Sequence, residues 1–119
     1  MIRIIFLALA LVAFMANAEN NSVPIGAIAA PPLVYWSSLG KTEKVKQLLA
    51  EKLDPNAVDE KGWSALQAAA ENGHIDVVKL LVKAGANLNY SSTGGTALQS
   101  ATSAKQYAVV QYLKSVGAQ

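Results

Sequence analysis

Few residues of this 119-residue chain have the side chains that catalysis requires. Cysteine is absent and His74 is the only histidine, which excludes a thiol nucleophile, a cysteine zinc site and a histidine metal cluster. A serine hydrolase would need Ser64 or Ser100 beside His74 as its base. Ser64, however, begins a Ser-x-x-Gln pattern, in which the hydroxyl caps a helix start. We therefore expect no catalytic residues, and a hydrolase is the least favoured hypothesis.

The other polar residues do not indicate a metal, nucleotide or nucleic-acid site. Asp54, Asp59 and Asp76 are separated along the chain, and each fits a turn or a helix end. The glycine pair 94–95 is too short for a phosphate-binding loop. Without Arg3, nine lysines stand against eight acidic residues, a balance that excludes a strongly basic nucleic-acid binder. We expect no cofactor, no metal, no nucleic acid and no small-molecule substrate.

The first eighteen residues have the pattern of a secretory signal peptide. Arg3 gives a positive start, and residues 4–15 are twelve uninterrupted apolar residues. Residues 16–18, Ala-Asn-Ala, fit the small-x-small rule for cleavage before Glu19. A twelve-residue helix rises about 18 Å, well short of the ~30 Å hydrocarbon core of a bilayer. We predict a cleaved signal peptide over residues 1–18, and an uncleaved membrane anchor is the alternative.

The same region predicts a bacterial periplasmic protein. It has no twin-arginine pair, which favours the general secretory route. The absence of cysteine excludes a bacterial lipoprotein and suits an oxidising compartment, because there are no thiols to mispair. Residues 19–31 are polar and then punctuated by proline and glycine, and we predict a linker there.

A repeat of about 33 residues sets the expected architecture. Residues 64–69 (Ser-Ala-Leu-Gln-Ala-Ala) align with residues 96–101 (Thr-Ala-Leu-Gln-Ser-Ala) at an offset of 32. Upstream the offset is 33, which places Gly73 on Gly40. Three copies at this period predict a stacked solenoid. The predicted repeats are residues 32–58, 59–90 and 91–119.

Each copy carries two helical signals, so an all-α fold is expected. The first helix begins with a capping box at 64–67 or 96–99, and with Pro32 in the first copy. Gly85 and Gly117 stand where a second helix ends in a left-handed residue. In the second helices apolar residues recur at i, i+3 and i+4: Val45, Leu48, Leu49; Ile75, Val78, Leu81, Val82; Tyr107, Val110, Leu113.

The second copy resembles the ankyrin repeat family. Residues 59–70, DEKGWSALQAAA, are similar to the family pattern D-x-x-G-x-T-P-L-H-x-A-A, and residues 71–81, ENGHIDVVKLL, to x-x-G-H-x-x-V-V-x-L-L. The resemblance covers residues 32–119. It implies a short solenoid of three helix-turn-helix repeats with projecting β-turn fingers, and a non-catalytic protein-binding module.

Several positions depart from the family pattern, among them Ala65 and Ala97, which replace its proline. Gln67 and Gln99 replace its histidine, and Lys52 and Lys105 stand where other repeats have glycine. The atypical terminal repeats are expected of caps that cover an otherwise open core.

The resemblance also implies where a partner protein binds, because fingers and first helices form the binding surface of such stacks. Trp63 stands where the family tolerates almost any residue, and tryptophan is frequent in interface hot spots. The alternative is that its ring packs across the finger onto a neighbouring turn, and Tyr90 has the same two interpretations. The adjacent pair Tyr35 and Trp36 is expected instead to seal the first repeat. The predicted partner-binding residues are Glu60, Lys61, Trp63, Glu71, Asn72, Tyr90, Ser92 and Thr93.

The sequence thus predicts a monomeric periplasmic protein that binds another protein without catalysis. One version is an immunity or inhibitor protein for a toxic enzyme, and another is an adaptor for an envelope enzyme. The residues do not choose between these versions. The alternative is a membrane-tethered scaffold that retains residues 4–15.

Processing of the export signal is directly measurable. We expect the purified chain to begin at Glu19, because the residues before it fit signal peptidase. Intact mass spectrometry of the protein from its own cells checks this. A chain heavier by roughly 2 kDa that stays with membranes after a salt wash would show a retained anchor.

Overall fold

The computed structural model describes residues 31–119, so the predicted signal peptide and residues 19–30 of the predicted linker lie outside it. Within the described residues, six helices form three helix-turn-helix pairs. These are α2 (Pro32–Ser38) with α3 (Thr42–Ala50), α4 (Ala65–Glu71) with α5 (Ile75–Lys83), and α6 (Ala97–Ser103) with α7 (Tyr107–Ser115). None of these helices has the length and apolar character needed to cross a bilayer.

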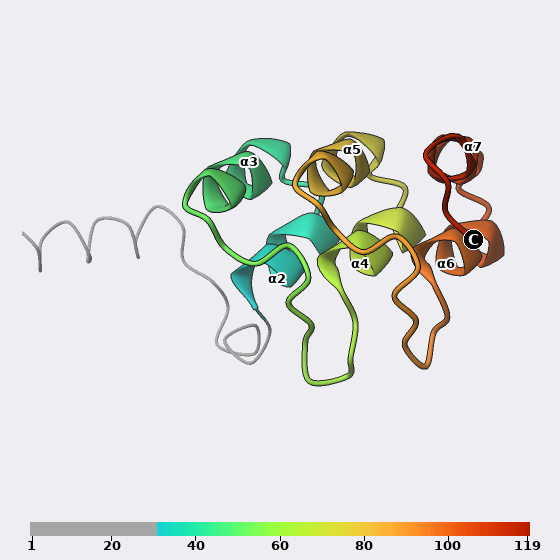
Figure 1. Cartoon of the computed structure of the whole chain (residues 1–119), viewed down its shortest axis with the longest axis horizontal. Helices are drawn as coiled ribbons and strands as arrows, with labels where there is room; N and C mark the ends of the chain where they lie inside the picture. Colours follow the sequence, from blue (N-terminus) through green and yellow to red (C-terminus); the bar gives the residue numbers. More distant parts are fainter. Residues whose placement is uncertain (1–30) are drawn as a thin grey trace, which may run out of the picture.

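The helices stack in two rows (Figure 1). In the inner row, α4 packs between α2 and α6, and in the outer row α5 packs between α3 and α7. Two turns project from the stack: the first turn, residues 58–64, and the second turn, residues 90–96. Each turn is closed by a single antiparallel bridge, and the described residues contain no strand. The predicted all-α repeat solenoid is therefore confirmed.

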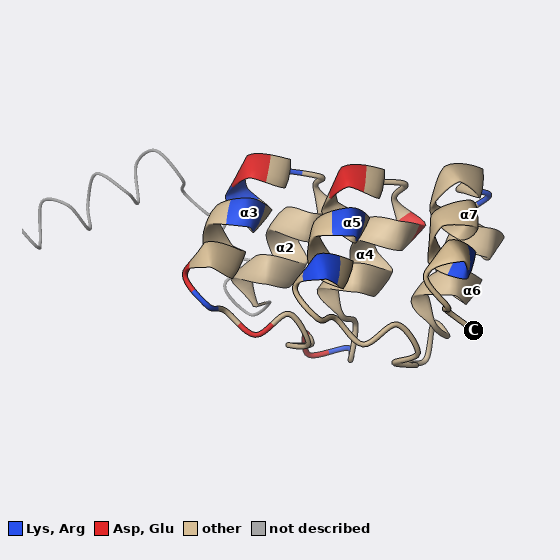
Figure 2. Cartoon of the chain, turned by 45° about the horizontal axis from the view of Figure 1, so that its top comes forward, with Lys and Arg blue, Asp and Glu red and all other residues tan. Residues whose placement is uncertain are grey.

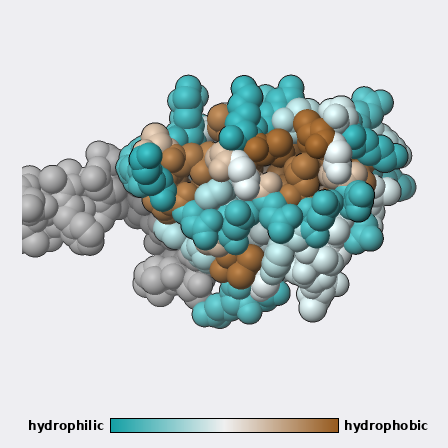
Figure 3. Space-filling model, viewed as in Figure 1, coloured by the Kyte–Doolittle hydropathy of each residue, from teal (hydrophilic) through white to brown (hydrophobic). Residues whose placement is uncertain are grey.

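Charge is distributed unevenly between the two rows (Figure 2). The outer helices carry five lysines and two acidic residues, a net charge of +3. The only charged residues of the inner row and the two turns are Asp59, Glu60, Lys61 and Glu71, a net charge of −2. On the face shown in Figure 3, hydrophobic residues gather in a band over the helices, whereas the region of the projecting turns ranges from teal to near white apart from one small hydrophobic group.

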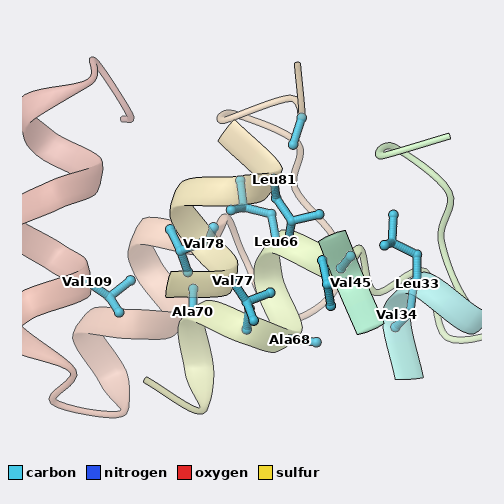
Figure 4. Packing of buried hydrophobic residues seen from close by; sticks show 14 of the residues in the cluster. Leu33, Val34, Val45, Leu66, Ala68, Ala70, Val77, Val78, Leu81 and Val109 are labelled. Carbon is cyan, nitrogen blue, oxygen red and sulfur yellow. The ribbon is translucent and has the colours of Figure 1, made fainter. Parts of the chain in front are cut away.

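The core is a thin layer between the two rows, and small residues let the helices approach closely. Leu33 of α2, Leu66 of α4 and Leu81 of α5 are at most 1% exposed. Side chains from both rows point into this layer (Figure 4). Ala69 and Ala70 of α4 are fully buried, which brings the backbones of the inner row together. This packing gives α4 a fixed position between its neighbours.

The predicted helix starts and stops are confirmed. Ser64 Oγ accepts from the backbone N–H of Gln67 at 3.1 Å, and Gln67 Oε1 accepts from that of Ser64 at 3.0 Å. The same capping box joins Thr96 and Gln99 at 3.2 and 2.9 Å. The left-handed residues after α5 and α7 are glycines, as predicted. Lys52, two residues after α3, adopts the same conformation with φ of 66°, a strain that a glycine would relieve.

The buried side chain of Gln67 also joins the second repeat to the third. It is 1% exposed, and its Nε2 donates to Ser92 Oγ at 3.0 Å and to the carbonyl of Gly95. Gln99 occupies the equivalent position one repeat later and is exposed. The two glutamines therefore cap equivalent helices, but of the two only Gln67 is buried and bonds the next turn. We call this contact between Gln67 and the second turn the inter-repeat joint.

A second set of hydrogen bonds joins the repeats at the far end of the inner helices. His74 Nε2 lies 3.1 Å from the carbonyl oxygen of Ser38, which can only accept, so this nitrogen carries the proton. Gln106 Nε2 donates to the carbonyl of Glu71 at 3.1 Å. A Cβ on Gly40 would lie 2.4 Å from the His74 ring, so this joint requires glycine. His74 thus has a structural role in the stack.

The matched glutamines give a test of the inter-repeat joint. We expect Gln67→Ala to lower the free energy of unfolding by about 2–4 kcal/mol, because it leaves a cavity and unpaired buried groups. Gln99→Ala removes a capping interaction alone and should cost about 1 kcal/mol or less. Urea unfolding of both variants measures the difference, and equal losses would contradict the assigned joint.

Candidate partner-binding groove

A groove of about 310 Å³ lies where the first turn faces helices α2 and α4. We call it the α2–α4 groove. Four of the eight predicted partner-binding residues line it, namely Lys61, Trp63, Glu71 and Asn72. The rest of its lining is Val34, Tyr35, Ser38, Asp59 and Ala68. Residues of the inner helices thus form one wall, and residues of the first turn form the other.

The first turn holds its shape through Asp59. The Oδ1 atom of this residue accepts from the backbone N–H groups of Lys61 at 2.9 Å and of Trp63 at 2.8 Å. The backbone N–H of Asp59 donates to the Trp63 carbonyl at 2.9 Å, and that of Gly62 donates to the Asp59 carbonyl at 3.0 Å. An aspartate that bonds its own backbone in this way fixes a tight turn. The result is a defined backbone position for Trp63.

The second turn fixes Trp63 from its other side. A Cβ atom on Gly94 would lie 2.6 Å from Cζ2 of Trp63, so the indole ring rests directly against the glycine backbone. The hydroxyl of Tyr90 donates to the carbonyl of Gly62 at 2.7 Å, which ties the two turns together beside the ring. Trp63 therefore both packs across the turns and lines the α2–α4 groove.

The other four predicted residues lie outside the groove lining. Tyr90 and Ser92 have internal partners. Tyr90 bonds the first turn, in line with the packing interpretation of this residue, and Ser92 bonds Gln67. Glu60 and Thr93 are exposed residues of the two turns. At the offset of 33 residues Tyr90 aligns with Ala57, so comparing the repeats gives no signal for its bond.

Tyr35 also lines the groove, although the sequence predicted a different role for it. It was expected to seal the first repeat together with Trp36, and the two rings do form an edge-to-face pair with centroids 5.0 Å apart. Tyr35 lines the α2–α4 groove, whereas Trp36 lines a separate hollow at the start of α3. The sequence does indicate that Tyr35 lies in the groove. At the offset of 33 residues Tyr35 aligns with Ala68, and it precedes Ser38 by one helical turn, so it lies on the same helix face as Ser38.

The residues weighed for hydrolysis have other partners. Ser64 Oγ caps α4, and Ser100 Oγ donates to the carbonyl of Gly94 at 3.3 Å. His74 is bonded to the Ser38 carbonyl. Across residues 31–119 no three His, Asp or Glu side chains are grouped as a metal site would require. The groove lining instead has aromatic, amide and carboxylate side chains that a partner protein could contact.

Comparison with known proteins identifies the family. The sequence profile described as "Ankyrin repeats (3 copies)" matches residues 33–119. The chain belongs to the ankyrin repeat family. Ankyrin repeats are protein-binding modules and are generally non-catalytic. The ankyrin repeat domain of human ASB11 has the same fold, with a TM-score of 0.71, 30% identity, and coverage of 75% of this chain and 41% of that chain.

Curated relatives are much longer proteins. "Ankyrin repeat-containing protein P1E11.10" of Schizosaccharomyces pombe is 39% identical over 65 residues, which is 55% of this chain and 31% of the relative. The "Potassium channel AKT2/3" of Arabidopsis thaliana is 34% identical over 98 residues, 82% of this chain and 12% of the channel. The chain thus spans less than a third of either relative.

The contact between the two turns predicts a spectroscopic change. In a Trp36→Phe background, where Trp63 is the only tryptophan, Gly94→Ala should move the fluorescence maximum to longer wavelength. The reason is that the new methyl group displaces the ring into solvent. Thr93→Ala, at the neighbouring exposed position, should leave the maximum unchanged. An unshifted spectrum for Gly94→Ala would show that the ring does not rest on this glycine.

Proposed function

We propose that this ankyrin repeat protein is exported to a bacterial periplasm and binds another protein there through the α2–α4 groove. It acts without catalysis, as an immunity or inhibitor protein or as an adaptor for an envelope enzyme. The observation that carries the proposal is the position of Trp63, which lines the groove while its ring is held by the second turn.

Three features of the groove support protein binding. Trp63 and Tyr35 offer aromatic surface of the kind that dominates interface hot spots. The turn that carries Trp63 is fixed by its own hydrogen bonds and by Tyr90, so little conformational entropy is lost on binding. The two exposed groove residues at the end of α4, Glu71 and Asn72, give polar groups at the margin.

The proposed location rests on residues 1–18. Their positive start, apolar stretch and Ala-Asn-Ala ending support export by the general secretory route. A chain without cysteine is also suited to an oxidising compartment. An inhibitor and an adaptor would use the same groove, and the partner's enzymatic activity with and without the chain separates them.

Two tryptophans provide a matched test. The full chain with a C-terminal tag is purified from the envelope fraction of its own cells, and bound proteins are identified by mass spectrometry. We expect one stoichiometric partner. Trp63→Ala should weaken its binding by about 30-fold, roughly 2 kcal/mol, because the ring contacts the partner. Trp36→Ala, outside the groove, should leave the affinity within about threefold.

Thermal unfolding of both variants confirms that each remains folded at the assay temperature. Equal binding by wild type and Trp63→Ala would move the partner-binding surface away from the groove. The absence of any stoichiometric partner from the envelope would contradict the proposed function itself.

A further inference from the structure

We propose that the α2–α4 groove takes a basic, extended segment of the partner, with an arginine next to an apolar side chain. This inference rests on the proposed function and specifies the chemistry of the partner. Three observations carry it: the charge on the groove side of the stack, the aromatic and carboxylate groups of the lining, and the size of the groove.

The groove side of the stack is acidic although the whole chain is slightly basic. The inner row and the two turns have a net charge of −2, against +3 on the outer helices and +2 for the whole chain. Two of the three acidic residues on that side, Asp59 and Glu71, line the groove. A cationic segment is therefore attracted to the groove side, and an acidic one is attracted to the outer helices.

The lining suits a guanidinium group in particular. Its plane stacks on an aromatic ring, and its N–H groups bond a carboxylate in pairs. The groove holds both kinds of group, the indole of Trp63 and the exposed side chain of Glu71. The Asp59 carboxylate is less available, because its Oδ1 already accepts two backbone N–H groups.

The remaining lining fits an apolar neighbour of the arginine. Val34 and Ala68 are buried residues that reach the groove from α2 and α4, and Tyr35 adds a second aromatic ring. A volume of about 310 Å³ is at the lower end of ligand sites, which suits one or two side chains of an extended segment. Lys61, the only cation in the lining, is exposed, and its flexible chain can turn toward solvent.

A displayed library of random dodecapeptides tests this chemistry. The immobilised full chain selects peptides, and affinities of the enriched peptides are measured as synthetic samples. We expect a consensus with arginine beside leucine, isoleucine or an aromatic residue. Its binding should weaken about tenfold in Glu71→Gln and in Trp63→Ala. The matched variant Glu43→Gln, which removes one charge from the outer helix α3, should bind as wild type.

The other outcomes of the peptide selection separate failure of the proposed basic segment from failure of the groove as the binding surface. A neutral or acidic consensus whose binding is lost in Trp63→Ala would overturn the basic segment and leave the groove as the partner-binding surface. A basic consensus that still binds both groove variants would place the peptide elsewhere and overturn the inference. A library without enrichment would also overturn it, whereas the proposed function would still stand on a partner purified from the envelope.

Discussion

The structure depends on one buried polar side chain, the amide of Gln67. It closes the capping box of α4 and, through Nε2, bonds the second turn at Ser92 and Gly95. A buried amide without these partners would destabilise the fold by about 1–3 kcal/mol, so the side chain ties a helix start to the next repeat. In a stack where each repeat touches only its neighbours, such joints set the stability of the whole.

The same contact between Gln67 and the second turn helps to position the residues that line the groove. Because Gln67 holds the second turn in place, Gly94 meets the ring of Trp63 and Tyr90 reaches the carbonyl of Gly62. The second turn thus acts as a support for the first, and the first carries the groove residues. Loss of the joint would therefore affect partner binding as well as stability. The contact between the two turns thus supports both the stack and the proposed binding groove.

The repeat pattern was sufficient to predict the helix pairs and their caps, because both depend on neighbours in sequence. It also predicted four of the nine residues that line the groove, Trp63 and Glu71 among them. The internal bond of Tyr90 could not be predicted, since it joins two turns 28 residues apart and has no counterpart in another repeat. The position of Tyr35 in the groove was not predicted, because Tyr35 and Trp36 were given one shared role in sealing the first repeat. The two side chains in fact line different hollows.

We propose that a partner protein covers the groove beside the first turn. Hydrogen–deuterium exchange of the chain, alone and with its purified partner, tests it most directly. We expect slower exchange at the backbone amides of residues 59–63 and 68–72 in the complex, and unchanged exchange in α3 and α5. Protection confined to the outer helices would contradict it.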